Sequence, residues 1–140
     1  MKKLKIILII LAMFTATTVL LSHLSIVDSV SMEPTLMPGD IVLCSKNIDS
    51  HDIRLHDVII FRSLEDDSTL LVKRVYNIKY NHADNIEYDV RGDNKNNSCD
   101  SRSFGLVPME KIDGKACIIL ASWDCEQKKI RQDRFWKRIK

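Results

Sequence analysis

The first 27 residues differ in pattern from the rest of the chain. Residues 6–27 carry no formal charge, counting His23 as neutral, and lysines stand before them at positions 2, 3 and 5. As an α-helix this run would extend about 33 Å, enough to cross a hydrocarbon core of roughly 30 Å. We predict that residues 1–27 form a basic end followed by one transmembrane helix over residues 6–27. Because basic residues stay on the cytoplasmic side, the N-terminus should be cytoplasmic.

A cleaved signal peptide is the alternative for this segment. The basic start fits one, and residues 15–17 are small. The apolar run nevertheless continues through residues 19–21, beyond the core of a short signal peptide. A buried helix of a globular domain fits less well, because residues 6–11 are apolar on every side. We therefore expect a retained anchor.

Beyond residue 28 the pattern is that of short β-strands. Runs rich in Val and Ile, bounded by turn-forming residues, predict strands over residues 40–45, 58–62, 70–76, 86–90 and 116–122. Turn signals stand at residues 38–40, 92–94 and 113–115. No strongly amphipathic helix is predicted before the tail. We predict a small, mostly β domain over residues 28–127.

The tail, residues 128–140, has two interpretations. It contains seven basic residues and one acid, with four large apolar side chains, at Ile130, Phe135, Trp136 and Ile139. As an amphipathic helix it would lie on anionic lipid head groups. Alternatively it is a solvated tail or an edge strand whose aromatic side chains close the core. The sequence leaves both interpretations open.

Composition and charge narrow the class of protein. A chain of 140 residues with 45% hydrophobic and 29% charged residues has the makeup of one folded domain. Residues 28–127 carry 18 acids against 11 basic residues. A nucleic-acid-binding domain usually spreads basic residues over its folded part, so we expect no nucleic-acid partner.

Four cysteines follow the predicted anchor, at positions 44, 99, 117 and 125. In an exported domain they permit two disulfides, with three possible pairings. No C-x-x-C spacing occurs, so a zinc site has little support. Cys44 and Cys117 lie in apolar strand-like runs, and we favour small core residues over a disulfide framework for them. The disulfide pairing of the four cysteines stays open.

Common catalytic patterns are absent. The sequence has no G-x-S-x-G elbow, no S-x-x-K motif, no Walker loop, no dinucleotide fingerprint and no H-E-x-x-H. His51 and His56 lie in a polar stretch, and we interpret them as exposed loop residues rather than metal ligands or a catalytic base.

Lys73 is the unusual residue of the predicted strand at 70–76. Strand alternation puts Lys73 on one face with Leu71 and Val75, and Arg74 on the other. An ammonium group among apolar neighbours loses hydration, which lowers its pKa. A fall of roughly 3 units from about 10.4 would let it deprotonate a serine hydroxyl near neutral pH. Taken alone, pairing with carboxylates at a sheet edge is the simpler interpretation.

Three segments in a fixed order change this interpretation. Residues 31–36 read S-M-E-P-T-L before P-G-D, residues 73–75 read K-R-V, and residues 92–102 read G-D-N-K-N-N-S-C-D-S-R before F-G-L-V-P. Together with the preceding apolar segment, they resemble the bacterial type I signal peptidases. These are membrane-bound Ser-Lys proteases that remove signal peptides from exported proteins. The resemblance extends to residues 122–124, and three boxes in order are highly specific.

The resemblance implies a role for each polar residue of the boxes. Ser31 resembles the nucleophile and Lys73 the general base. The backbone N–H of Ser31 and the hydroxyl of Ser29 resemble the two donors of the oxyanion hole. Ser98 resembles the hydroxyl that orients the lysine amine. Charged residues would brace the loop, namely Asp93, Asp100, Arg102 and Arg74.

The resemblance also implies the substrate and the setting. Shallow apolar pockets for small residues would be lined by Val27, Met32, Leu36, Val42, Val58, Leu71 and Val72, where core packing is an equal alternative. The implied enzyme, signal peptidase I, cleaves exported pre-proteins at Ala-X-Ala sites without metal or cofactor. We expect a monomer in the bacterial cytoplasmic (inner) membrane. Its signal-peptidase-like β domain, similar to that of autocleaving repressors, would lie outside the cytoplasm.

Four departures from the family pattern bear on this expectation. Val30 and His56 stand where many members have Gly, and residues 76–85 lack the family's G-x-P-G-D stretch. The length of 140 residues leaves no space for a large second domain or second anchor. A dedicated maturation peptidase, such as those of conjugative transfer, is therefore the alternative. A catalytically inactive anchored subunit would be expected to have lost Ser31, Lys73 or Ser98.

Overall fold

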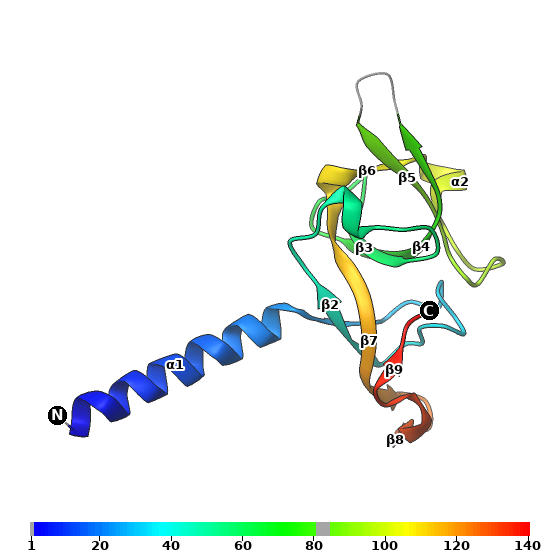
Figure 1. Cartoon of the computed structure of the whole chain (residues 1–140). Helices are drawn as coiled ribbons and strands as arrows, with labels where there is room; N and C mark the ends of the chain where they lie inside the picture. Colours follow the sequence, from blue (N-terminus) through cyan, green and yellow to red (C-terminus); the bar gives the residue numbers. More distant parts are fainter. Residues whose placement is uncertain (1, 81–84) are drawn as a thin grey trace.

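A long N-terminal helix extends away from a β domain (Figure 1). The computed structural model describes residues 2–80 and 85–140, and within them it leaves out the side chains of residues 2–4 and 18–21. Residues 81–84, part of the stretch that lacks the family's Gly and Pro, are therefore outside the described residues, as are the side chains of Lys2 and Lys3.

The helix α1 (Lys2–Ser22) is shorter than the predicted anchor. The helix ends at Ser22, inside the uncharged run of residues 6–27, and Leu24–Ile26 of the same run form strand β1. The helical part of the run therefore extends about 25 Å instead of about 33 Å. Within the described residues, no helix combines the length and apolarity needed to cross a membrane, so the predicted transmembrane helix is not found there.

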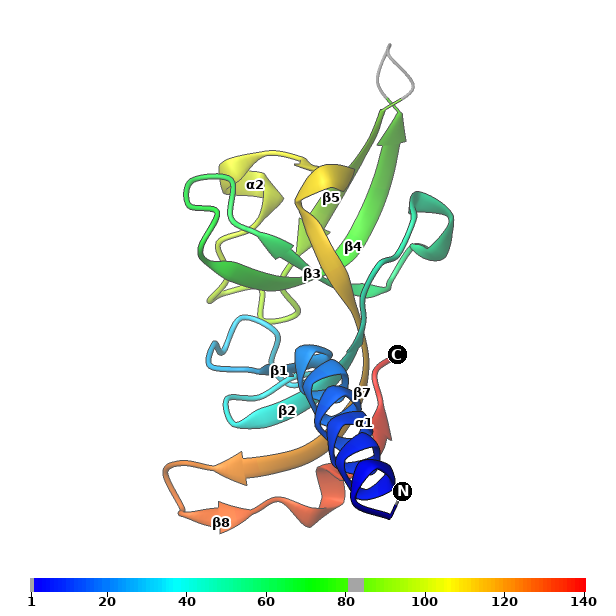
Figure 2. The same cartoon turned by 90° about the vertical axis from the view of Figure 1, so that its left-hand side faces the viewer.

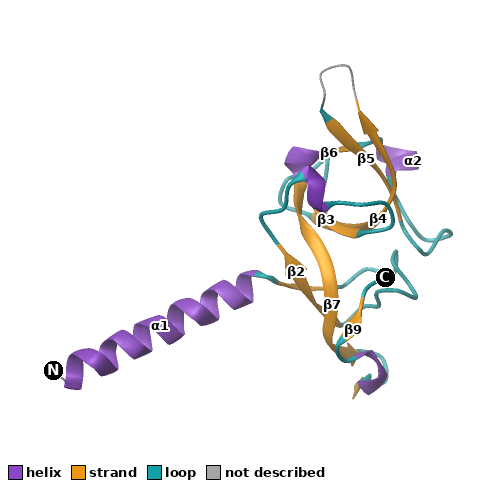
Figure 3. Cartoon of the chain, viewed as in Figure 1, coloured by secondary structure: helices purple, strands orange, loops and turns teal. Residues whose placement is uncertain are grey.

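The β domain is built from antiparallel strands, which confirms the mostly β prediction (Figure 3). The strands of the described residues are β1, β2 (Asp40–Ser45), β3 (Val58–Arg62), β4 (Leu70–Tyr80), β5 (Ile86–Arg91), β6 (Val107–Pro108), β7 (Ile112–Asp124), β8 (Lys129–Ile130) and β9 (Lys137–Arg138). They pair in the order β1-β2-β7-β3-β4-β5-β6, and β8 and β9 also pair with β7. Short helices of the described residues lie in the connections, namely η1 (Ser50–Asp52), α2 (Ser101–Phe104), η2 (Met109–Lys111) and η3 (Gln132–Arg134).

The predicted strands are all present, two of them with the predicted bounds. β2 and β3 match, whereas β4, β5 and β7 are longer than their apolar runs. The turn predicted at residues 113–115 is wrong, because these residues lie inside β7. A Cβ at Gly114 would stand 2.6 Å from the carbonyl oxygen of Ser45, so this glycine permits a close approach of two strands.

Strand β3 separates two core clusters. Val58 and Ile60 belong to one cluster, and Ile59 and Phe61 belong to the other. The first cluster contains Met32 and Leu36 of the first box (residues 31–36). The second cluster contains buried side chains of β5 and β6. Because successive strand residues point to opposite faces, β3 is buried on both sides and holds β4 and β7 in place.

The tail forms edge strands and not an amphipathic helix. β8, η3 and β9 follow β7 at the end of the chain (Figure 2). The N–H of Ile139 donates to the carbonyl of Cys117 at 3.0 Å. Ile139 packs against the first core cluster, while Trp136 is 73% exposed. Of the two interpretations left open, the edge strand is the one found, because β7 offers unpaired backbone groups to a segment whose basic side chains can remain in water.

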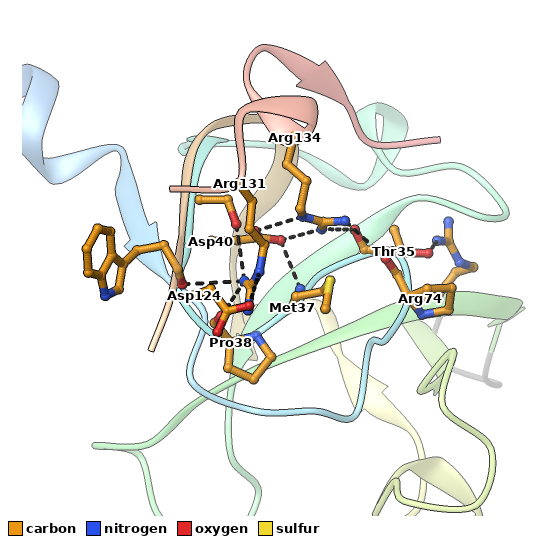
Figure 4. A network of polar contacts seen from close by, with 11 residues as sticks. Thr35, Met37, Pro38, Asp40, Arg74, Asp124, Arg131 and Arg134 are labelled. Atoms are coloured by element: carbon orange, nitrogen blue, oxygen red, sulfur yellow. Dashed lines mark hydrogen bonds and ion pairs between the residues drawn. The ribbon is translucent and has the colours of Figure 1, made fainter. Parts of the chain in front are cut away.

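Arg134 of η3 ties the tail to residues near the first box. Its guanidinium is buried and donates to both carboxylate oxygens of Asp40 and to the carbonyl of Thr35 (Figure 4). Burial alone would raise the pKa of Asp40, but hydrogen bonds from Arg134, Ser122 and the Met37 N–H hold it below its usual value. This pair was not predicted, because nothing in the tail distinguishes Arg134 from its basic neighbours.

The four cysteines are free thiols in the described structure. Cys44 is buried in the first core cluster, in agreement with the preferred interpretation. Cys117 is half-buried, and its thiol donates weakly to the carbonyl of Lys115. Cys99 and Cys125 are exposed.

Candidate active site

Ser31 lies in a tight turn between β1 and β2. The Glu33 N–H donates to the carbonyl of Val30 at 3.1 Å, and the Leu36 N–H donates to that of Met32 at 2.9 Å. Met32 and Leu36 are both 0% exposed in the first core cluster. The apolar residues of the first box therefore anchor the turn and hold Ser31 in place.

The side chains of Ser31 and Lys73 meet inside the domain. The Lys73 Nζ lies 2.6 Å from the Ser31 Oγ, although the two residues are 42 positions apart. Both residues are 4% exposed. In the described part of the chain, no carboxylate forms an ion pair with Lys73. A hydroxyl and an amine are thus in direct contact, shielded from water.

Burial sets the protonation of this amine. Loss of hydration lowers the pKa of Lys73 from its ordinary value, while the negative charge of Asp100 and the Cys99 thiol act in the opposite direction. A lysine with a lowered pKa carries a free electron pair over more of the neutral pH range. The arrangement can therefore transfer a proton from the Ser31 hydroxyl to Lys73.

The two predicted oxyanion-hole groups are neighbours. The backbone N–H of Ser31 donates to the Oγ of Ser29 at 3.2 Å. Ser29 is exposed, whereas Ser31 is buried. The Ser29 hydroxyl retains its own proton to donate. An oxygen atom entering beside Ser31 would thus meet one backbone and one side-chain donor.

Ser98 does not make the contact with the Lys73 amine that was predicted for it. Its hydroxyl donates to Oδ2 of Asp100 at 3.1 Å, and within the described residues Lys73 hydrogen-bonds to Ser31 and not to Ser98. A Cβ at Gly92 would lie 2.2 Å from the Ser98 Oγ and 2.6 Å from the carbonyl oxygen of Ser31. Gly92 therefore allows the third box (residues 92–102) to pack closely against the turn that carries Ser31. This role of Gly92 was not predicted, although the glycine belongs to that box.

The predicted bracing residues form two ion pairs. Arg74 binds Asp93 through Nε at 2.8 Å and Nη2 at 2.7 Å. Arg102 binds Asp100 through Nε at 2.8 Å and Nη2 at 2.7 Å. The hydrogen bonds of Arg102 lower the pKa of Asp100, which also accepts from the Gly92 N–H. The third box is thus held by carboxylates that remain ionised.

An apolar groove of about 240 Å³ adjoins the turn before Ser31. Five of the predicted pocket residues line it, namely Val27, Leu36, Val42, Leu71 and Val72. Met32 and Val58 do not line this groove; they are 0% and 2% exposed and pack in the core. The other lining residues were not predicted from the sequence; they are Leu24, Ser25, Ile26, Asp28, Ile60, Leu70 and Ala116.

Two of the histidines were considered as candidate ligands or bases. His51 and His56 are both exposed. His56 has a φ of 73°, a left-handed conformation that suits the glycine found there in the resembling family. Across residues 2–80 and 85–140, no cluster of His, Cys, Asp or Glu side chains is arranged to hold a metal ion.

Comparison with known proteins agrees with the three boxes. The chain matches the family described as signal peptidase, peptidase S26, over residues 1–79 and 79–123. It is 31% identical over 105 residues to mitochondrial inner membrane protease subunit 1 of Xenopus tropicalis, covering 63% of this chain and 62% of the relative. It is 34% identical over 109 residues to the mitochondrial ATP-independent inner membrane protease subunit 1a of Arabidopsis thaliana, covering 63% and 64%.

A shorter match links the chain to a bacterial enzyme. It is 57% identical over 35 residues to signal peptidase I of Aquifex aeolicus, covering 25% of this chain and 14% of the relative. The alignments thus cover less than two thirds of the length of each of these relatives. The family match itself includes Ser31, Lys73 and the third box. The chain belongs to the signal peptidase, peptidase S26, family.

Proposed function

We propose that the chain is a membrane-bound serine endopeptidase that cleaves N-terminal signal peptides from exported pre-proteins. The observation that carries the proposal is the 2.6 Å contact between the Ser31 Oγ and the Lys73 Nζ. Burial of both side chains and the lowered pKa of Lys73 support a role for the pair in acyl transfer.

The proposed mechanism uses Lys73 twice. Ser31 attacks the scissile carbonyl carbon while its hydroxyl proton moves to Lys73. The Ser31 N–H and the Ser29 hydroxyl stabilise the oxyanion, each by about 3 kcal/mol. Lys73 then gives the proton to the leaving amine. A water molecule, deprotonated by Lys73, hydrolyses the acyl-enzyme and restores Ser31.

The groove suits an extended substrate with small side chains. β1 contributes Leu24, Ser25 and Ile26 to it, and the start of β4 contributes Leu70, Leu71 and Val72. Branched side chains make the groove shallow and apolar. A peptide that runs along β1 as an added strand would place small residues such as alanine against these walls. Cleavage after Ala-X-Ala is the corresponding specificity.

Membrane attachment belongs to the same proposal. The described side chains of α1 between Ile6 and Phe14 are largely apolar and exposed. We propose residues 1–27 as the membrane-attached segment in the bacterial cytoplasmic membrane, residues 28–127 as the extracytoplasmic peptidase, and residues 128–140 as the C-terminal tail. Exposed Ile130 and Trp136 among basic residues would let this tail touch anionic head groups. We propose that the enzyme acts as a monomer.

A dedicated peptidase of the same family is the second candidate. Two of the relatives are named as proteases of the mitochondrial inner membrane and not as signal peptidase I. Asp28 also lines the mainly apolar groove, and within the described residues it has no ion-pair partner. An unpaired carboxylate in the groove favours a narrower set of substrates than small side chains alone would select.

Processing of a reporter pre-protein with an Ala-X-Ala site tests the proposal. Wild type in detergent is compared with Ser31→Ala and Lys73→Ala, and mass spectrometry identifies the new N-terminus. Cleavage after the second alanine by wild type alone is the expected result. A folded wild type that leaves this reporter intact but cuts another pre-protein would favour the dedicated peptidase. Undiminished cleavage by Ser31→Ala would refute the mechanism.

A further inference from the structure

The peptide group between Val30 and Ser31 is held at both ends. Its N–H belongs to Ser31 and is one of the proposed oxyanion-hole donors. Its carbonyl belongs to Val30 and accepts two hydrogen bonds, from the Glu33 N–H at 3.1 Å and from the side-chain Nδ2 of Asn94 at 3.1 Å. Both acceptor positions of this carbonyl are therefore used.

Asn94 makes a second contact with the same turn. Its backbone N–H donates to the carbonyl of Ser31 at 3.0 Å. One residue of the third box thus binds the carbonyls on both sides of the Ser31 α-carbon. Any residue at position 94 keeps the backbone contact, but the contact with Val30 requires a side-chain donor of the length of asparagine.

The orientation of this peptide group decides whether an oxyanion hole exists. If the group rotated by half a turn, the Val30 carbonyl would replace the N–H and would repel a developing negative charge. Rotation would break the hydrogen bonds from Glu33 and Asn94 together. A donor bound to the carbonyl also polarises the peptide group, which strengthens its N–H as a donor.

We propose that Asn94 is a positioning residue of the oxyanion hole. Its side-chain amide holds the Val30–Ser31 peptide group with the Ser31 N–H directed toward the Ser29 hydroxyl, where the substrate oxyanion forms. The inference rests on the proposed peptidase function. Asn94 touches no reacting atom, and it acts through the peptide group that it binds.

The test is Asn94→Ala in the full chain, with Asn96→Ala as the matched control. Asn96 lies in the same loop, is exposed, and makes no hydrogen bond in the described structure. Because the lost interaction acts in the transition state, we expect kcat on the reporter pre-protein to fall about fivefold to tenfold with KM within about twofold. Inhibition by a peptide aldehyde, whose adduct places an oxyanion in the hole, should weaken by the same factor.

Two further readings separate positioning from general loss of structure. The midpoint of the pH dependence of kcat/KM should be the same in Asn94→Ala and wild type, because Lys73 keeps its surroundings. Hydrogen exchange at the Ser31 amide should accelerate at least about fivefold in Asn94→Ala and stay unchanged in Asn96→Ala. This exchange is measured on the resting protein, so it needs no substrate.

The outcomes distinguish this inference from the function on which it rests. A kcat within twofold of wild type, a loss confined to KM, or an equal loss in Asn96→Ala overturns the role of Asn94. A wild type that cleaves no pre-protein overturns the proposed function. If the wild type is inactive, hydrogen exchange at the Ser31 amide still tests the role of Asn94. An unchanged exchange rate in Asn94→Ala overturns that role, and an accelerated rate supports it.

Discussion

Strand β4 carries two adjacent cations in opposite environments. Lys73 is buried against Ser31, and burial lowers its pKa. Arg74, one residue further, donates to Asp93, to the carbonyls of His56 and Lys140, and to the Thr35 hydroxyl. Its hydrogen bond to Asp93 raises its pKa.

The contrast shows how two adjacent basic residues take different roles, one in proton transfer and one in holding the structure. Strand alternation sends the two side chains to opposite faces. A lysine without a carboxylate partner can lose its proton, whereas a guanidinium with saturated donors cannot. The Lys73 face is therefore suited to chemistry, and the Arg74 face holds the first box, the third box and the tail together.

The largest expected effect comes from removing the amine. Lys73→Met should lower the cleavage rate by at least about 10³-fold, because the nucleophile loses its base. The free energy of unfolding should stay equal or increase, since a buried ammonium group is costly to dehydrate. Reporter cleavage and urea unfolding measure the two effects. Lys73→Arg is the control: it keeps the charge and should remain inactive, so activity in it would contradict a proton-transfer role.

Removing the neighbouring cation should give the reverse result. Arg74→Met leaves Asp93 half-buried without its partner and should lower the free energy of unfolding by about 2–3 kcal/mol. The cleavage rate of the folded fraction should fall less than tenfold. The double variant Arg74→Met/Asp93→Asn should recover part of the stability in urea unfolding. A loss of activity as large as that of Lys73→Met, with unchanged stability, would break the comparison.

The pH dependence sharpens the comparison further. The value of kcat/KM should rise with pH as Lys73 loses its proton, with a midpoint below the ordinary lysine pKa of 10.5. The negative charge of Asp100 raises the pKa of Lys73, so Asp100→Asn should move the midpoint to lower pH by up to about one unit. Asp93→Asn is the control and should leave the midpoint in place. A midpoint that rises in Asp100→Asn would contradict this electrostatic coupling.

Stability should respond to alkaline pH through the Lys73 face. The folded pKa of Lys73 lies below its unfolded value, so the unfolded state binds the proton more tightly. The destabilisation is complete below the folded pKa and is relieved as pH rises toward 10.5. The stability advantage of Lys73→Met should therefore shrink at alkaline pH in urea unfolding.

The smallest expected effect lies on the Arg74 face. His56 has a φ of 73°, and its carbonyl accepts from Arg74. Glycine adopts this conformation without the strain of a side chain, so His56→Gly should stabilise the fold by about 0.5–1 kcal/mol. Thermal unfolding measures the gain, and reporter cleavage should stay at the wild-type rate. A lower melting temperature would show that the imidazole contributes more than the strain costs.

Much of the β domain was predictable, whereas for the tail at its edge the sequence left two interpretations open. The runs that became β2 and β3 are apolar and bounded by turn residues, so local pattern and final structure agree. β8 and β9 are two residues each and have no pattern of their own. They exist because β7 offers backbone partners beyond the residues that its other neighbours pair, which a prediction from the tail alone cannot include. β8 pairs beyond the end of β2, and β9 pairs beyond the end of β3.

The sequence by itself determined the family of the chain and the alternation that separates Lys73 from Arg74. Both depend on residue identity and spacing along one segment. The tertiary structure decided that Ser31 and Lys73 meet at 2.6 Å, that Ser98 binds Asp100, and that Asn94 holds the Val30 carbonyl. Those contacts depend on the packing of segments far apart in the chain or on the local backbone path, which spacing alone does not specify.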